Sequence, residues 1–406
     1  MTRSVIVSHP FGNPNSYNAA LAFHEGKLLS CFHTCLYSPL HSRRRFHPGL
    51  ADAPIRTHPG SELARLAMTV VASPRWNGRS PNMVDRIGTA FDRTVAKYIS
   101  ESDGAIYAYE DWAYHSFLKA RDFGLATLYE LPTSYFLEKA TLLSRNVERE
   151  PDLKSYFPGL NEPEIKLIRK ERELELAEVV ICPSTFVLKS ITGRVPINSR
   201  VHVIPYGVDT TVAPKIWQRD DFHRPLKLVY AGALVPQKGL HYLFQALDSL
   251  PFYSYTLTLA GRWISGYREW LDRRYQVHYE YIGHVPHHNL YDVYRANHVL
   301  VLPSICDGFG LILLEAMASG IPVIATDRTG APDVLTHGRE GFLVRAGSTE
   351  DLVKAIERCL DDTESLAEMG TLARRKAEEL SWSAYRRRLI ATLGRGAELA
   401  CESVYN

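Results

Sequence analysis

Short apolar runs alternate with amphipathic segments along most of the chain. Runs of β-branched and aromatic residues bounded by turn residues predict strands, whereas apolar residues at helical spacing predict helices. In the first half, the predicted strands are 4–8, 27–34, 104–109, 126–130, 179–184 and 201–204. The predicted helices are 17–25, 61–68, 82–100, a segment ending at Arg121, and 163–177. This alternation is typical of a parallel sheet that is covered by helices on both faces.

The same alternation restarts in the second half, after residues 210–225 lose all periodicity. The predicted strands are 226–232, 255–261, 277–282, 298–303 and 323–325, and the predicted helices are 240–250, 290–296, 349–360 and 364–379. The sequence therefore predicts an α/β protein with two doubly wound, Rossmann-like domains facing a cleft. We expect a first domain at 1–208, a second at 209–384, and a closing helix at 385–406 that returns to the first.

Composition agrees with two ordinary domains. The chain has 406 residues, of which 45% are hydrophobic and 23% are charged, which is enough for two full cores and gives no sign of disorder. A formal net charge of +2 gives no support to a nucleic-acid partner. Two arginine triplets, 43–45 and 386–388, are interpreted as solvated faces, and the second was also weighed as a peripheral membrane contact.

The sequence contains no uninterrupted apolar run of about 18 residues and no pattern of a secretory signal, so we expect a cytoplasmic location. Six scattered cysteines form no disulfide framework, which fits a reducing compartment. Cys31 and Cys35 are the one close pair. They are interpreted as strand thiols because no second pair has zinc-like spacing with them, and no metal site is expected.

One stretch, 301–325, combines a strand, a loop, a helix and a second strand. Asp307 lies in the loop, and Glu315 lies about two turns into the helix. The helix begins after a glycine pair, and the free N–H groups of a helix N-terminus suit a phosphate. An anionic ligand that carries hydroxyl groups is therefore the expected guest.

The first half offers weaker candidates. The loop after its first strand has one glycine, Gly12, and lacks the G-x-G-x-x-G pattern that a dehydrogenase would need. Gly12 either makes the turn or lets a ligand phosphate approach the backbone. Glu130, at a predicted strand end, and His115 are candidate active-site residues, with a loop carboxylate and a surface histidine as the alternatives. Residues 41–59 form an irregular loop that lies at the surface or faces the substrate.

The residues from Asp307 to Thr326, together with 232–239 and 205–209, resemble the family 4 retaining glycosyltransferases of GT-B fold. The resemblance implies a nucleotide-diphospho-sugar donor bound by the second domain and an acceptor bound by the first. It implies transfer to an acceptor hydroxyl in the cleft, with retention of anomeric configuration. It also implies that no cofactor or metal is needed beyond the donor itself. The family transfers hexose-type sugars to glycans, glycolipids or small molecules.

The resemblance also implies individual roles. The residue matching Glu315 holds the donor ribose, the one matching Asp307 contacts the donor sugar, and the one matching Lys238 neutralises the diphosphate. The loop 283–285 holds the base, largely through its main chain. Taken singly, Glu315 could be an ordinary helix carboxylate, Lys238 a loop lysine and Asp307 a helix cap. Their joint spacing instead favours a donor-binding site. The candidate catalytic residues are Lys238, Asp307 and Glu130, and the candidate donor-binding residues are Gly12, Gly232, Lys238, Arg262, His284, Val285, Asp307, Gly308, Phe309, Gly310, Leu311 and Glu315.

Two positions depart from the family pattern. Asp307 stands where glutamate is usual, and Ala233 stands where the family has an arginine five residues before the motif lysine. Arg262, after a predicted strand, is our hypothesis for the missing cation. Other classes stay open: a nucleotide-sugar hydrolase or epimerase would share the architecture, and a scaffold subunit that has lost catalysis would share the fold.

Overall fold

The computed structural model describes residues 4–38, 46–60, 62, 81–157, 160, 162–196, 199–217 and 225–399. The predicted helix 61–68 lies, apart from residue 62, outside these residues, and so do the arginine triplet 43–45 and much of the linker 210–225.

The first half forms a parallel sheet with the strand order β3-β2-β1-β4-β5-β6-β7. Its strands are β1 (Ser4–Ser8), β2 (Leu29–Thr34), β3 (Ile55–Thr57), β4 (Asp103–Tyr109), β5 (Ala126–Glu130), β6 (Val179–Cys182) and β7 (Arg200–Val203). Its helices are α1 (Pro14–Glu25), α3 (Pro81–Ala96), α4 (Tyr114–Asp122), α5 (Phe136–Arg149), α6 (Glu164–Leu176) and α7 (Thr185–Ser190), with short 3-10 turns at η2 (Pro48–Leu50) and η3 (Pro151–Tyr156).

The second half forms another parallel sheet, with the order β10-β9-β8-β11-β12-β13. Its strands are β8 (Leu226–Leu234), β9 (Tyr255–Trp263), β10 (Tyr279–Gly283), β11 (Val299–Leu302), β12 (Val323–Thr326) and β13 (Gly341–Val344). Its helices are α8 (Leu240–Asp248), α9 (Tyr267–Asp272), α10 (His287–Ala296), α11 (Leu311–Ala318), α12 (Ala331–Val334), α13 (Thr349–Asp361), α14 (Ser365–Glu379) and α15 (Trp382–Leu399), and η6 (Pro236–Lys238) is a 3-10 turn.

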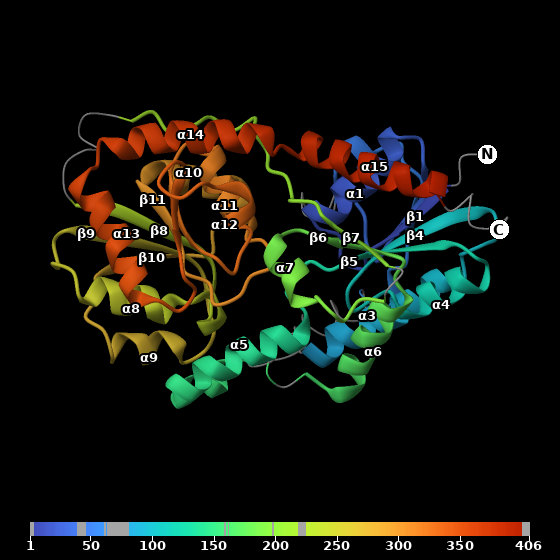
Figure 1. Cartoon of the computed structure of the whole chain (residues 1–406), viewed down its shortest axis with the longest axis horizontal. Coiled ribbons are helices and arrows are strands. Elements are labelled where there is room, and N and C mark those ends of the chain that lie inside the picture. The colour runs from blue at the N-terminus through green and yellow to red at the C-terminus, as the bar shows by residue number, and fades with distance from the viewer. Residues whose placement is uncertain are drawn as a thin grey trace.

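The two sheets lie side by side, each flanked by helices (Figure 1). Central strands such as β4, β6, β11 and β12 are buried along their whole length, as expected for a parallel sheet covered on both faces. The predicted architecture of two doubly wound sheets is confirmed.

Two helices connect the halves. The side chains of Leu142 and Leu143 on α5 pack into the core of the second half, and the Tyr242 hydroxyl donates to Asn146 Oδ1 at 2.5 Å. On the opposite side of the molecule, α15 packs on α1 of the first half, as Figure 1 shows. α15 therefore packs against the first half of the chain. The exact domain limits at 208 and 384 stay predictions.

The sequence analysis missed β3, α5, α7, α9, α12 and β13, and it ended two strands too early. β8 and β9 each extend two residues beyond their predicted ends, so Arg262 lies within β9 and not after it. The pair Cys31 and Cys35 consists of a half-buried thiol on β2 and a buried one just after it. None of the helices in the described ranges has the length and apolar character that crossing a membrane requires.

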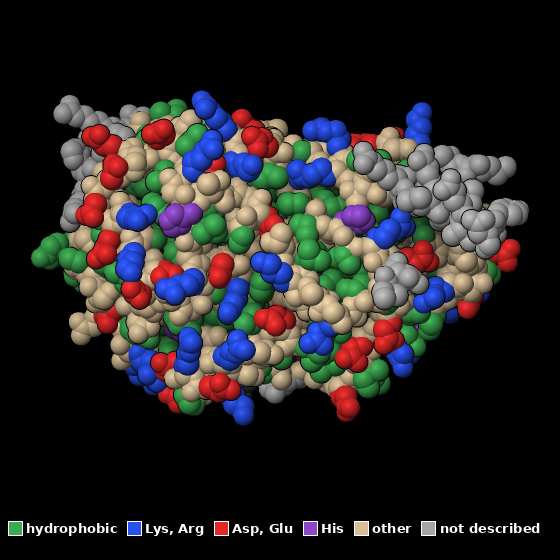
Figure 2. All heavy atoms as spheres, viewed as in Figure 1, with side chains coloured by type: hydrophobic (Ala, Val, Ile, Leu, Met, Phe, Trp, Pro, Cys, Tyr) green, Lys and Arg blue, Asp and Glu red, His purple; other side chains and the backbone are tan. Residues whose placement is uncertain are grey.

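The charged surface is mixed. On the face drawn in Figure 2, acidic and basic side chains are interspersed over both halves. The arginine triplet on α15 is largely engaged within the protein: Arg386 donates to Glu25 and Asn18 of α1, each at 2.8 Å, and Arg388 donates to the Pro205 carbonyl at 3.1 Å. These contacts dock α15 on the first half, so the interpretation of the triplet as a solvated face was wrong for Arg386 and Arg388.

Candidate functional site

The candidate site lies where the second sheet changes direction. The chain winds outward from β8 to β10 on one side and from β11 to β13 on the other, so the loops after β8 and β11 separate at their carboxyl ends. A cavity of about 270 Å³ opens there. It is lined by Tyr230, Ala231, Gly232, Ala233, Lys238, Leu302, Asp307, Phe309, Gly310, Leu311 and Ile312 from the second half, and by Asn15, Pro132 and Tyr206 from the first half and the segment after β7.

Lys238 and Asp307 form an ion pair at the wall of this cavity. Their side chains are 24% and 18% exposed, so the pair lies at the boundary between protein and cavity. The backbone behind it is tight: Gly239 has φ +73°, and a Cβ there would overlap the Pro303 carbonyl. A glycine at this position thus lets the lysine turn pack against the loop after β11.

The N-terminus of α11 also faces the cavity. Its N-cap residue, Gly310, has φ +79° and makes no side-chain cap, so the first N–H groups of the helix have no capping acceptor. Gly310, Leu311 and Ile312 line the cavity. A lysine ammonium and an uncapped helix N-terminus on one wall together suit an anionic group such as a phosphate.

Glu315 lies one turn further along α11, outside the cavity lining. Its side chain is 8% exposed; Oε1 lies 2.9 Å from His287 Nε2, and Oε2 accepts a 3.0 Å hydrogen bond from the Tyr294 hydroxyl. The loop that contains His284 and Val285 leads directly into α10, which carries both partners. His287 and Tyr294 were missed, although their spacing of seven residues places them on one helix face.

Glu130 does not line the cavity. Its side chain is fully buried, and its two oxygens accept hydrogen bonds from the hydroxyls of Tyr107 and of Tyr206, the latter at 2.5 Å. Burial raises the pKa of Glu130 to about 7, although these hydrogen bonds lower it. The prediction that Glu130 contacts substrate finds no support in this position, because Tyr206 stands between it and the cavity.

Gly12 serves its own loop. It has φ +55°, its N–H donates to His9 Nδ1 at 3.0 Å, and a Cβ there would overlap the Tyr17 side chain. Burial lowers the pKa of His9 to about 3, so its ring stays neutral and can accept from the loop. The turn-making interpretation of Gly12 therefore fits the structure better than a ligand contact.

Gly308 lies in close contact with the first half. A Cβ at Gly308 would overlap the Pro132 carbonyl oxygen of the first half. Its own carbonyl accepts a 2.6 Å hydrogen bond from Ser184 Oγ, and next to it the Thr185 N–H donates to Asp333 Oδ2 at 2.9 Å. The loop with Asp307 is thus seated between both halves.

Arg262 lies beside the position where the family arginine is missing. In the β8–β9 ladder it pairs with Ala233, which lines the cavity. Paired residues of neighbouring strands are about 5 Å apart, within easy reach of an arginine side chain. The Arg262 side chain is exposed, and it has no hydrogen-bond or ion-pair partner among the described residues.

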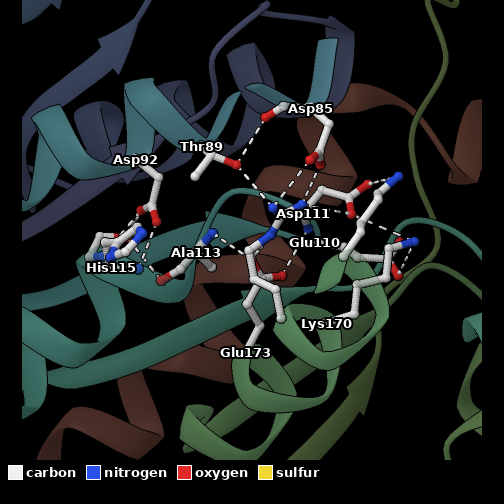
Figure 3. A network of polar contacts seen from close by, with 12 residues as sticks. Asp85, Thr89, Asp92, Glu110, Asp111, Ala113, His115, Lys170 and Glu173 are labelled. Atoms are coloured by element: carbon white, nitrogen blue, oxygen red, sulfur yellow. Dashed lines mark hydrogen bonds and ion pairs between the residues drawn. The ribbon is translucent and has the colours of Figure 1, made fainter. Parts of the chain in front are cut away.

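His115, the other first-half candidate, belongs to a polar network away from the cavity (Figure 3). Its N–H donates to Asp92 Oδ2 at 2.6 Å, and Arg93 Nε lies 3.0 Å from its Nε2. In the same network, Glu173 accepts from the N–H groups of Asp111 and Ala113 at 2.8 and 3.1 Å. These contacts join α3, α4 and α6, which is a structural role.

Comparison with known proteins identifies the second half. Residues 214–376 match the family model described as Glycosyl transferases group 1. The part of the chain that carries most of the cavity is therefore similar to the group 1 glycosyltransferases. Lys238, Asp307 and Glu315 lie inside the matched residues, and the cavity is lined by these residues and by the first half.

Among curated relatives, a D-inositol 3-phosphate glycosyltransferase from Gordonia bronchialis is 43% identical over 93 residues, which cover 23% of this chain and 20% of that protein. Matches of this kind span between 20% and 57% of the relatives' own length.

Solved structures resemble the whole chain. A sucrose-phosphate synthase from Thermosynechococcus elongatus matches with a TM-score of 0.71 and 19% identity, covering 98% of this chain and 100% of that one. HepE from Anabaena, in complex with UDP and glucose, matches with a TM-score of 0.65 and 16% identity, covering 97% and 100%. The chain therefore has the GT-B fold over both halves.

Proposed function

We propose that this chain transfers a hexose-type sugar from a nucleotide-diphospho-sugar to an acceptor hydroxyl, with retention of anomeric configuration, as a family 4 glycosyltransferase. The observation that carries the proposal is the cavity between the halves, where Lys238, Asp307 and the uncapped N-terminus of α11 share one wall. The donor would be bound by the second half, and the acceptor would approach from the first.

Each donor group has a matching protein group. The diphosphate would lie against Lys238 and the N–H groups of α11, which would stabilise the negative charge as the leaving group departs. Asp307 would accept from hydroxyls of the donor sugar. Glu315, held by Tyr294, would accept from the ribose diol after His287 yields its oxygen. The main chain around His284 and Val285 would hold the base.

Arg262 would supply the second cation. Its place beside Ala233 and its lack of a partner among the described residues support this role. In the proposed reaction the diphosphate leaves as positive charge develops on the sugar, and it takes the acceptor proton on the same face. The proposal assigns charge neutralisation to Lys238, Arg262 and α11 and assigns no metal. Transfer should therefore continue in the presence of EDTA.

A thermal-shift panel of UDP, GDP and ADP sugars tests donor binding, because a ligand that binds only the folded state raises its apparent stability. UDP sugars are tried first because HepE, of the same fold, is described with UDP and glucose. We expect one nucleotide to raise the melting temperature and Arg262→Ala to weaken that effect. No shift with any nucleotide sugar would contradict the proposal, and an unchanged Arg262→Ala would remove Arg262 from it.

A further inference from the structure

We propose that Glu130 is a positioning residue that holds Tyr206 against the donor-binding loop, so that its ionisation sets the affinity of the cavity. This inference rests on the proposed function, because it concerns the donor pocket. It replaces the direct role that the sequence suggested for Glu130.

Tyr206 connects three parts of the molecule. Its hydroxyl donates to Glu130 Oε1 at 2.5 Å, at the carboxyl end of β5. Its ring lines the cavity and packs edge-on against Phe309, with ring centroids 5.4 Å apart. It also contacts α15, with the Tyr385 ring centroid 6.0 Å away. A change in the hydrogen bond at Glu130 would therefore be transmitted to the loop that contains Phe309.

The hydrogen bonds around Glu130 fit a carboxylate. An ionised carboxyl group only accepts, and both oxygens accept here, one from Tyr107 and one from Tyr206. A protonated carboxyl group carries an O–H donor on one oxygen, so the hydrogen bond with one of the two tyrosines would have to weaken or reverse its direction. The buried hydroxyl of Tyr109 lies beside Glu130 and that of Tyr385 lies beside Tyr107, so both offer alternative partners. The network can thus rearrange when Glu130 gains a proton.

No cation among the described residues offsets the charge of Glu130. The titratable groups that face it are Tyr107 and Tyr109 from β4, Cys182 from β6, Tyr206, and Tyr385 from α15. Burial raises the pKa of each of these groups, so all are neutral near pH 7. Arg388 of α15 instead donates to the Pro205 carbonyl, beside Tyr206. The charge state of Glu130 is therefore set near neutral pH by burial and by the tyrosine hydroxyls.

The test is the binding of UDP between pH 6 and pH 8.5, measured by calorimetry on the full chain. Wild type, Glu130→Gln and Tyr206→Phe are compared at each pH, because the ratio of their dissociation constants cancels the ionisation of UDP itself. If UDP does not bind, GDP and ADP take its place. Glu173→Gln is the matched control, since Glu173 is an equally buried carboxylate in the first half whose contacts lie in the separate network of Figure 3.

The measured quantity is the ratio of the dissociation constant of wild type to that of Glu130→Gln. We expect this ratio to be roughly tenfold higher at pH 6 than at pH 8, as the loss of one hydrogen bond suggests. Glu130→Gln and Tyr206→Phe should both lack this dependence, while Glu173→Gln keeps it. Thermal unfolding at each pH confirms that every variant is folded. A wild type that binds UDP with the same pH dependence as Glu130→Gln would overturn the inference. A wild type that binds none of the three nucleotides would instead overturn the proposed donor pocket.

Discussion

Replacing Lys238 by methionine tests the electrostatics of the proposed donor site. Two unit charges about 4 Å apart interact by roughly 4 kcal/mol at an effective dielectric constant of 20. Because the Lys238 side chain is 24% exposed, solvent screening reduces this energy. A charge-assisted hydrogen bond contributes about 1.5–3 kcal/mol, so we expect Lys238→Met to bind UDP roughly 10- to 100-fold more weakly.

Asp307 makes the prediction sharper, because it is the partner of Lys238 in the free protein. Without Lys238, the Asp307 carboxylate would repel the diphosphate. The double variant Lys238→Met/Asp307→Asn should therefore bind UDP several-fold better than Lys238→Met alone, although both should be inactive in transfer. Calorimetric titration of the two single variants and the double variant gives the coupling directly.

Lys227→Met is the matched control. Lys227 lies exposed near the start of β8, roughly 20 Å from the cavity end of the strand, which exceeds the screening length of about 10 Å at 0.1 M salt. The Lys227→Met substitution removes the same charge at a position too far from the cavity to affect the ligand. The reasoning fails if Lys238→Met binds UDP as tightly as Lys227→Met, or if the effects of the Lys238 and Asp307 substitutions simply add.

Three further outcomes are expected. Gly308→Ala should lower transfer at least tenfold while UDP binding persists, because the added methyl group would overlap the Pro132 carbonyl of the first half. Equal losses of binding, measured by calorimetry, and of transfer, measured by kinetics, would contradict this expectation. Glu315→Ala should abolish most transfer by removing the ribose acceptor, and Tyr294→Phe should weaken nucleotide binding more mildly; near-normal rates for Glu315→Ala would exclude it from the site. Glu130 should destabilise the fold as pH rises, because its pKa is about 7 in the folded state and near 4.5 in the unfolded state. The folded state therefore keeps the proton to higher pH, and the free energy of unfolding falls between pH 4.5 and pH 7. Denaturant melts should show a loss of up to about 3 kcal/mol relative to Glu130→Gln. A constant stability difference from pH 5 to pH 8 would show that Glu130 does not titrate in this range.

Much of the fold could be predicted because parallel strands in a covered sheet are almost wholly apolar. β11 and β12 are buried throughout, and their apolar runs are bounded by proline, glycine and polar residues. β3 was missed because it is a three-residue edge strand with exposed residues, which leaves little pattern. α5 was missed because half of it packs on the other half of the molecule, so no single local core explains its apolar positions.

The candidate site was predicted unevenly for a similar reason. Lys238 and Asp307 lie in loops that follow two predicted strands, and ligands bind at the carboxyl ends of strands in such sheets. The structure places both residues at one cavity. Glu130 was misplaced because a strand end does not reveal whether its last side chain points to solvent or to the helix layer. Tyr206 was missed because its importance arises from rings and a carboxylate that are far away in the sequence.

The most direct test of the central claim is a transfer assay with the donor that the thermal-shift panel selects. Nucleotide release is followed with and without a panel of sugar and polyol acceptors, and the product is examined by proton NMR. The account predicts release that depends on an acceptor, a new glycosidic bond with the anomeric configuration of the donor, and loss of both in Lys238→Met. Release without an acceptor would identify a hydrolase, and binding without turnover across the panel would contradict the assignment of a transferase.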